Sequence, residues 1–312
     1  MDHHRLTESS KHSPADYNLV MRVAVLYNPV AGRGRSAKGI RRAMGVFQNL
    51  GAKVDLVESN SSAHLTELAS KVSSEAYERI VIAGGDGTLN RVLRGLNLER
   101  TVAGLLPLGS GDDFAQAAGI PRSITEACKV VLNGRQRLVD VATVNGVRYL
   151  GVAGLGFDSE VARYANEKIR WLRGSLLYLY ATLAVIQRFQ PRSIRYSVDG
   201  VVRDEEVMFV VVGNSPRYGA GVHIAPSARI DDGILDMVVI SKATKWQLLS
   251  TMPLAYKGRH VMRPFVSSHR GKDFRFESPE PMDVYADGEL VGHTPATIRL
   301  EPRKLRLMVP DV

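Results

Sequence analysis

The first third of the chain alternates short apolar runs with segments whose apolar residues recur every three or four positions. The apolar runs predict strands at residues 22–27, 54–57, 80–83 and 102–106. The helical spacing between them predicts helices near residues 40–50, 64–73 and 89–96. Strands that alternate with helices in this way indicate an α/β fold, with a parallel sheet covered by helices on both faces.

The pattern changes after about residue 134, where short strands separated by turn residues dominate. Asn145 and Gly146, placed between two apolar runs, predict a β-hairpin. Further strands are expected at residues 139–144, 148–152, 194–198, 207–212, 235–240, 274–277, 282–286 and 297–300, and one helix at residues 163–188. We therefore predict a mobile tail at residues 1–20, an α/β domain at 21–136 and a mostly antiparallel β-sandwich with an inserted helix at 137–312. The C-terminal tail of this second domain can pack back on the first.

Composition narrows the class of protein. The 312 residues are 45% hydrophobic, and the single cysteine, Cys128, fits a reducing, cytoplasmic compartment. Neither a signal peptide nor a run of about 18 apolar residues that could span a membrane is found in the sequence. The net charge of +9 suits anionic partners such as a nucleotide or an acidic membrane surface. Nucleic acid is not expected, because neither zinc-ligand spacing nor an RNA-binding signature accompanies the charge.

The most informative pattern is the glycine-rich segment at residues 83–90, which follows one predicted strand and opens a helix. Glycine lets the backbone approach a phosphate closely, and the start of a helix offers free N–H groups to an anion. The carboxylate of Asp86 would repel a phosphate unless a cation lies between them. The segment therefore indicates a nucleotide bound with Mg²⁺, although taken alone it could be an ordinary turn.

Three other segments accompany this one, at residues 28–36, 107–115 and 286–289. The loops that begin near Asn28, Gly84 and Leu108 follow parallel strands and should converge on one crevice. In this order the four segments resemble the diacylglycerol kinase catalytic family, which includes sphingosine and ceramide kinases. The soluble bacterial members of this family resemble the chain most. Residues 213–216 and 225–233 also look like signatures of the second domain of those bacterial members. The resemblance spans about residues 21–310 and implies ATP-dependent phosphorylation of a lipid hydroxyl in a cleft between two domains.

The same resemblance implies roles for individual residues of the first domain. Asp86 and Asp113 would bind the catalytic Mg²⁺, a hard ion that prefers oxygen ligands. The nucleotide would be contacted by Asn28, Pro29, Arg33, Ser59 or its neighbour Asn60, Gly84, Gly85, Asp86, Gly87, Thr88, Asn90 and Ser110. Arg35 or Lys38 could replace Arg33 at the phosphate, and exposed basic residues on a loop are the alternative interpretation.

Glu289 is the expected general base, which takes the proton of the lipid hydroxyl as the γ-phosphoryl group arrives. Such catalysis is typically worth about 10²–10⁴-fold. Residues 287–289 can also be interpreted as a plain hairpin turn, because Asp-Gly is a favoured turn pair. Asp86 is the rival candidate for the base.

A second, structural Mg²⁺ is implied near Asp232, because bacterial relatives hold one in this run. The carboxylate of Asp232 and the main-chain carbonyls of Arg229 and Ile234 would be its ligands, with a plain turn as the alternative. Two positions depart from the family pattern, since Asp112 stands where asparagine is usual and Gln116 where arginine is usual. The added negative charge and the missing positive one could weaken ATP binding or change the metal preference.

The lipid end of the site is less clearly encoded. Residues 163–173 are basic with interleaved aromatics, and Arg170, Trp171 and Arg173 suit a membrane interface. The leucines that follow favour packing in a core. Residues 154–158 would border the acceptor pocket by resemblance. The expected location is therefore the cytoplasm, with peripheral association at the membrane.

Other functions remain open at this point. An NAD kinase shares the glycine-rich loop, but residues 113–115 and 287–289 belong to the lipid kinase pattern. A nucleotide- or lipid-binding protein without turnover would fit Asp112 and Gln116, yet the joint presence of Asp86, Asp113 and Glu289 argues for turnover. Diacylglycerol is the first candidate among lipids. The sequence leaves the lipid and the oligomeric state open, a homodimer included.

Overall fold

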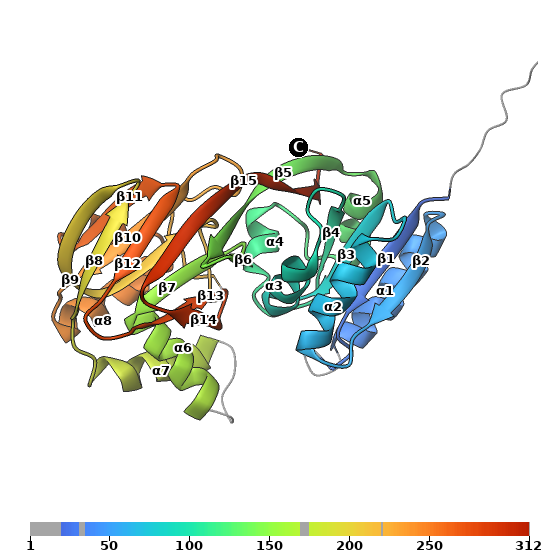
Figure 1. Cartoon of the computed structure of the whole chain (residues 1–312). Helices are drawn as coiled ribbons and strands as arrows, with labels where there is room; N and C mark the ends of the chain where they lie inside the picture. The colour runs from blue at the N-terminus through green and yellow to red at the C-terminus, as the bar shows by residue number, and fades with distance from the viewer. Residues whose placement is uncertain (1–19, 31–34, 169–174, 220, 312) are drawn as a thin grey trace, which may run out of the picture.

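The computed structural model describes residues 20–30, 35–168, 175–219 and 221–311 of the chain. The expected mobile tail therefore lies outside the described residues, apart from Val20. The described chain forms two lobes that lie side by side, with the N-terminal half in one and most of the C-terminal half in the other (Figure 1). Within these residues, no helix is long and apolar enough to cross a lipid bilayer.

Four parallel strands form the sheet of the first lobe. They are β1 (Arg22–Tyr27), β2 (Lys53–Glu58), β3 (Arg79–Gly84) and β4 (Val102–Pro107), in the order β2-β1-β3-β4. After the arginine that begins β1 and β3, the strands β1, β3 and β4 are apolar and almost fully buried, as expected of strands covered on both faces. The predicted parallel sheet is therefore confirmed.

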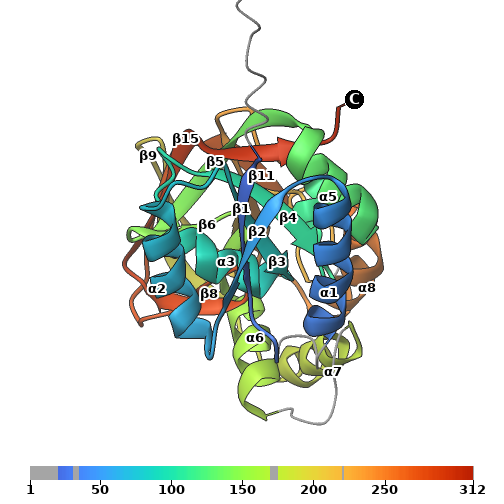
Figure 2. The same cartoon turned by 90° about the vertical axis from the view of Figure 1, so that its right-hand side faces the viewer.

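Helices cover both faces of this sheet. They are α1 (Arg35–Asn49), α2 (Ser62–Ser73), α3 (Asp86–Gly95), α4 (Asp113–Ala117) and α5 (Ile124–Asn133). Figure 2 shows α1 and α5 on one side of the strands and α2 and α3 on the other. Helices α4 and α5 were not predicted from the sequence, although the side chain of Ser123 caps α5 by accepting a hydrogen bond from the Glu126 N–H.

The second lobe is mostly antiparallel. Its strands are β6 (Val147–Tyr149), β7 (Val152–Gly156), β8 (Arg192–Val198), β9 (Val201–Gly213), β10 (Leu235–Ser241), β11 (Val266–Gly271), β12 (Asp273–Glu277), β13 (Asp283–Ala286) and β14 (Glu289–His293). The predicted hairpin is present, and both Asn145 and Gly146 have the positive φ that a tight two-residue turn requires. Tyr149, Tyr196 and Phe274 are among its fully buried core residues. The predicted α/β domain followed by an antiparallel, sandwich-like domain is thus confirmed.

Helices α6 (Phe157–Lys168), α7 (Ser175–Ile186) and α8 (Lys245–Ala255) and the short 3-10 helix η2 (His260–Met262) flank this sheet. The prediction of a single helix at residues 163–188 was wrong. The first helix begins at Phe157, directly after β7, and α7 packs against α6, an arrangement that one continuous helix could not make. The expected interface residues Arg170, Trp171 and Arg173 lie outside the described residues.

Two long strands connect the lobes (Figure 1). They are β5 (Arg135–Val144) and β15 (Ala296–Val309), which pair antiparallel over most of their length. Strand β15 pairs with β12 of the second lobe near its start. Near its end, Arg306 and Leu307 pair in parallel with β4 of the first lobe. The last strand of the chain therefore extends the sheets of both lobes and fixes their relative position.

Candidate active site

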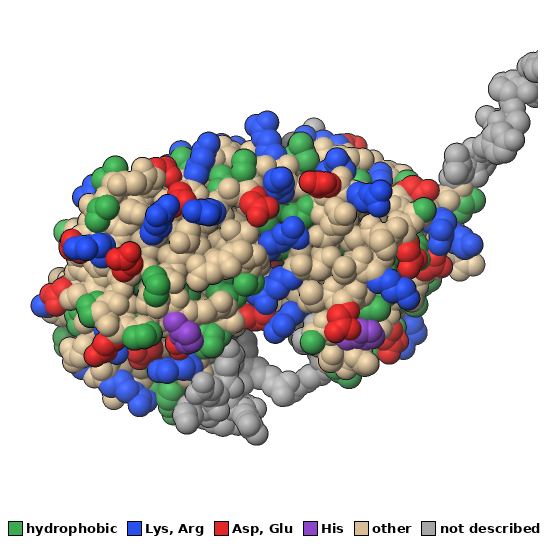
Figure 3. Space-filling view, in the orientation of Figure 1, with side chains coloured by type: hydrophobic (Ala, Val, Ile, Leu, Met, Phe, Trp, Pro, Cys, Tyr) green, Lys and Arg blue, Asp and Glu red, His purple; other side chains and the backbone are tan. Residues whose placement is uncertain are grey.

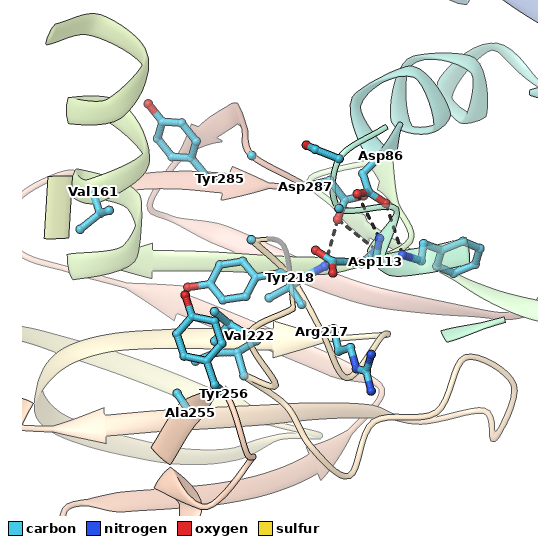
Figure 4. Close-up of a pocket in the computed structure, with 18 of the residues that line it drawn as sticks. Asp86, Asp113, Val161, Arg217, Tyr218, Val222, Ala255, Tyr256, Tyr285 and Asp287 are labelled. Carbon is cyan, nitrogen blue, oxygen red and sulfur yellow. Dashed lines mark hydrogen bonds between the residues drawn. The ribbon is translucent and has the colours of Figure 1, made fainter. Parts of the chain in front are cut away.

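A cleft of about 920 Å³ is lined by residues of both lobes. The surface is indented between the lobes, and Lys and Arg side chains lie along their boundary (Figure 3). One end of the cleft holds the carboxylates of Asp86, Asp113 and Asp287, and the other is formed by apolar and tyrosine side chains (Figure 4). These two ends are parts of one continuous space.

Two glycine loops meet at the acidic end. A side chain on Gly109 would place its Cβ only 2.6 Å from the Cα of Gly85, so bulk at this position is excluded. The expected loops after β3 and β4 therefore do converge, and Gly85, Gly87, Thr88 and Ser110 line the cleft. Because α3 begins at Asp86, its first N–H groups lie beside this space, as an anion site requires.

Asp86 connects the two loops. Its carboxylate oxygens accept hydrogen bonds from the N–H groups of Asp113 (3.1 Å) and Phe114 (3.3 Å), at the start of α4. Asp113 is buried and lines the same cleft. The two predicted ligands of the catalytic metal are thus brought together, one at the start of α3 and the other at the start of α4.

Asp112 lies beside them but is not a lining residue of the cleft. It has a left-handed backbone (φ 52°), and its carboxylate accepts the Gly109 N–H at 3.0 Å. Burial, followed by the neighbouring charge of Asp86, raises the pKa of Asp112 to about 6. The carboxylate that departs from the family pattern is therefore costly to ionise in the folded protein.

This raised pKa predicts a pH-dependent effect of Asp112→Asn. The folded state binds the Asp112 proton more tightly than the unfolded chain, so ionisation lowers stability above about pH 6 and has no effect below about pH 4. Asparagine removes the charge, keeps an acceptor for Gly109 and tolerates a left-handed backbone. We expect the free energy of unfolding to rise by about 3 kcal/mol at pH 7.5 and to be unchanged near pH 4.

Urea unfolding in the presence of a chelator measures this difference. The matched control is Asp199→Asn, because Asp199 also has a left-handed backbone (φ 46°) but is exposed on a hairpin. An equal gain in both variants would assign the effect to the backbone and contradict the role of the buried charge.

Asp287 was included in the family segment at residues 286–289 and in the alternative turn, but no feature of the sequence assigned it a role in the site. Asp287 and Gly288 both have positive φ and form the tight turn between β13 and β14, so the hairpin interpretation is correct. The Asp287 carboxylate also accepts N–H groups from Leu150, Gly151 and Val152 at 3.0–3.1 Å. Burial raises the pKa of Asp287 to about 6, and the charge of Asp86 adds to this effect. The aspartate therefore faces the acidic end from the second lobe.

Glu289 follows this turn but is not among the described residues that line the cleft. Its carboxylate bridges the lobes, with oxygens 2.7 Å from Arg91 Nε and 2.9 Å from Arg94 Nη1. Both arginines lie on α3, the helix that begins in the glycine-rich loop. Catalytic hydrogen bonds often tighten only when substrate is present, so this geometry does not decide the role of Glu289. Its function as the base stays a prediction.

The apolar end is built almost entirely by the second lobe. Its lining includes Phe157, Val161, Phe209, Val222, Ile224, Ile240, Leu248 and Met252, from helices α6 and α8, strands β9 and β10 and the loop between those strands. Tyr218, Tyr256 and Tyr285 also face this space (Figure 4). Such a lining suits a hydrocarbon chain rather than a second polar ligand.

One cation lines the described part of the cleft. Arg217 is the only Lys or Arg in the described lining of the cleft, and its Nη1 donates to Gln116 Oε1 at 3.3 Å. The Gln116 amide in turn donates to the Gly111 carbonyl at 2.6 Å. Gln116 thus links an arginine of the opposite lobe to the loop at residues 109–111.

Other expected nucleotide contacts are not gathered into the described cleft lining. Asn28, Pro29, Ser59, Gly84 and Asn90 are not part of that lining, and Arg33 lies outside the described residues. Gly84 instead packs on Thr88, because a Cβ at Gly84 would lie 2.4 Å from the Thr88 hydroxyl. The roles of these residues in nucleotide binding stay predictions.

The Asp232 carboxylate, the expected side-chain ligand of the second Mg²⁺, has protein partners in this structure. The Asp232 carboxylate lies 2.5 Å from Arg270 Nη2 and accepts the Ile234 N–H at 3.3 Å. Arg229 is exposed. The described residues contain no group of three or more His, Cys, Asp or Glu side chains placed to hold a metal. A structural Mg²⁺ at Asp232 therefore stays a prediction.

Asp86 and Asp113 do suit Mg²⁺ that arrives with a nucleotide. This ion is usually held by one or two carboxylates together with substrate phosphates and water. The charge of Asp86 contributes, after burial, to the raised pKa values of Asp112 and Asp287, and a cation at this end would relieve that repulsion. The donor set therefore fits a metal shared with phosphate rather than a metal bound by protein groups alone.

Comparison with known proteins places this chain in a family. Residues 22–144 match the family model for the diacylglycerol kinase catalytic domain. Residues 151–309 match a model described as the YegS C-terminal NAD kinase beta sandwich-like domain. The chain belongs to the diacylglycerol kinase catalytic family, a family of lipid kinases.

Individual relatives support this assignment. A protein of Mycobacterium tuberculosis named diacylglycerol kinase is 30% identical, with 93% of this chain and 95% of the relative covered. A diacylglycerol kinase of Bacillus subtilis is 27% identical over 93% and 96% of the two chains. A crystal structure of a diacylglycerol kinase from Bacillus anthracis has a TM-score of 0.71 at 21% identity, covering 93% of this chain and 96% of its own. The last comparison supports the fold.

Proposed function

We propose that this enzyme transfers the γ-phosphoryl group of ATP to the hydroxyl of diacylglycerol or a closely related lipid. The observation that carries the proposal is the continuity of one cleft from an acidic, glycine-lined end to an apolar end. The first end suits phosphate and Mg²⁺, and the second suits an acyl chain. The curated relatives named diacylglycerol kinase make this lipid the first candidate.

The acidic end would hold the nucleotide phosphates. The first N–H groups of α3 and the loop at residues 109–111 would cradle them, and Asp86 and Asp113 would hold Mg²⁺. The metal, when bound, would neutralise charge that develops on the transferring phosphoryl group. Arg217 would place a positive charge on the opposite side, where Gln116 already holds it. Catalysis would therefore rest on positioning and charge.

The lipid hydroxyl would enter from the apolar end. As its oxygen forms a bond to the γ-phosphorus, the bond between that phosphorus and the leaving oxygen of ADP breaks. The hydroxyl proton passes to a carboxylate, for which Glu289 remains our first candidate and Asp86 the rival. Asp287 would fix the loop at residues 150–152, which borders this point, through its three N–H bonds.

A panel of acceptors tests the proposal. Purified protein is given ATP and Mg²⁺ with diacylglycerol, monoacylglycerol, sphingosine, ceramide or NAD, and phosphorylated product is measured. We expect a lipid to be phosphorylated and NAD not, because the acceptor end is lined by apolar side chains. Phosphorylation of NAD alone would contradict the proposal.

A further inference from the structure

An amphipathic rim borders the apolar end of the cleft. It comprises residues 242–263, which include α8 and η2, and we call it the α8–η2 rim. Helix α8 buries Leu248, Thr251 and Ala255 on one side. Trp246 and Pro253 are seven residues apart and share the opposite, exposed side. The helix therefore presents a tryptophan away from the protein core.

Large apolar side chains are unusually exposed on this rim. The exposed fraction is 81% for Trp246, 79% for Met262 and 50% for Tyr256. Helix η2, which carries Met262, packs against α8. Single exposed apolar residues are common, but three in one short stretch of two packed helices require an explanation.

The charge of the rim is of one sign. Its charged residues are Lys242, Lys245, Lys257, Arg259 and Arg263, and Asp and Glu are absent from this stretch of the sequence. Lys242 pairs with Glu206, and Lys245 donates to the Gln187 carbonyl. Lys257 and Arg259 are exposed beside Tyr256. The rim thus combines exposed apolar side chains with positive charge, and it contains no acidic residue of its own.

The rim also reaches the cleft itself. Met252, Pro253 and Tyr256 belong to both the rim and the lining of the cleft. Tyr256 lies at the apolar end, near Tyr218 (Figure 4), and half of its surface is exposed. An apolar molecule that left a bilayer at this rim would therefore enter the cleft without crossing the acidic end.

We propose that the α8–η2 rim docks on an anionic lipid bilayer. Trp246 and Met262 enter the interface, while Lys257 and Arg259 contact headgroup phosphates. A second copy of the chain is a poorer fit, because a symmetric contact would set the cations of one rim against those of the other. The surface differs from residues 163–173, where the sequence pattern placed membrane contact. The proposal extends the proposed function, but its test needs no catalysis.

The chain contains two tryptophans, Trp171 and Trp246, so fluorescence can locate the docking surface. Trp171→Phe leaves Trp246 as the only reporter, and Trp246→Phe leaves Trp171. Each variant is mixed with vesicles of phosphatidylglycerol and chain-brominated phosphatidylcholine, without ATP. We expect bromine to quench Trp246 fluorescence. Vesicle binding without quenching of Trp246, or no binding at all, would overturn the proposal.

Affinity measurements give an independent test by vesicle sedimentation. Lys257→Ser should weaken binding roughly fivefold at low salt, the effect typical of one basic residue near an anionic surface. Trp246→Ser should weaken it as well. The matched controls are Arg203→Ser and Val201→Ser on the exposed β8–β9 hairpin, which should bind as the wild type does. Equal losses in controls and rim variants, or a change of oligomeric size in Trp246→Ser, would contradict membrane docking.

Discussion

Asp86→Asn should reduce phosphotransfer at least about 10²-fold while leaving the protein folded. Asp86 lines the acidic end and joins the two glycine loops through the N–H groups of Asp113 and Phe114. An amide in its place cannot serve Mg²⁺ as a carboxylate does, nor can it accept a proton. Turnover is measured at saturating ATP and Mg²⁺. Retention of more than about a tenth of the wild-type rate would mean that the variant raises the barrier by less than about 1.4 kcal/mol, and it would contradict the metal role.

The control for this variant must separate chemistry from stability, because Asp86 also caps the start of α4. Ser123→Ala removes a comparable cap from α5, at a residue that does not line the cleft. Ser123→Ala should lose about 1 kcal/mol of stability, and Asp86→Asn should lose no more than that, because asparagine caps a helix about as well as aspartate. Only Asp86→Asn should lose activity. A similar loss of activity in Ser123→Ala would show that the assay reports folding rather than catalysis.

Glu289→Gln should lower kcat about 10²-fold and leave ATP affinity nearly unchanged if Glu289 is the base. Glutamine keeps the shape of the side chain but cannot take up the hydroxyl proton. In the wild type, Arg91 and Arg94 hold the Glu289 carboxylate. The variant loses both ion pairs and should therefore also lose about 1 kcal/mol of stability. Turnover, calorimetric ATP binding and thermal unfolding of the same preparation separate these effects.

Asp283→Asn is the matched control for Glu289→Gln. Asp283 lies in the same hairpin and pairs with His293 at 2.9 Å, yet it is not a lining residue of the cleft. Its kcat should stay near the wild-type value. A near-normal kcat in Glu289→Gln as well would reduce Glu289 to a bridge between the lobes and favour Asp86 as the base.

Much of the fold could be predicted because local pattern and tertiary environment agree. The strands β1, β3 and β4 are continuous apolar runs apart from the arginine that begins β1 and β3, and the structure buries these runs on both faces. The hairpin at Asn145 and Gly146 was predictable because few residue pairs accept two successive positive φ values. The two carboxylates Asp86 and Asp113 could be placed together because loops after parallel strands share one edge of a sheet.

Two missed helices had signals of their own. Helix α5 begins with Ser123 and Glu126, and α8 begins with a full capping box between Thr244 and Gln247. The apolar spacing of α8 is weak, because its outward side carries Trp246 and Pro253 instead of polar residues. Its start was therefore encoded more clearly than its amphipathic pattern.

The apolar end of the cleft could not be found from sequence in the same way. Val161, Phe209 and Leu248 belong to three elements that are widely separated along the chain. In the sequence they are indistinguishable from residues of an ordinary core, since only the packing of the elements leaves a cavity between them. Similarly, the hydrogen bond between Arg217 and Gln116 joins opposite lobes, so the sequence around either residue does not indicate its partner.

The central claim is tested most directly by following the γ-phosphoryl group itself. Wild-type protein is incubated with γ-labelled ATP, Mg²⁺ and diacylglycerol in mixed micelles, and label in the lipid is compared with ADP formed. We predict one labelled phosphatidic acid for each ADP, and no transfer when Mg²⁺ is removed by a chelator. ADP formation at the same rate with and without lipid, with no label in any lipid, would contradict the assignment of this cleft to lipid phosphorylation.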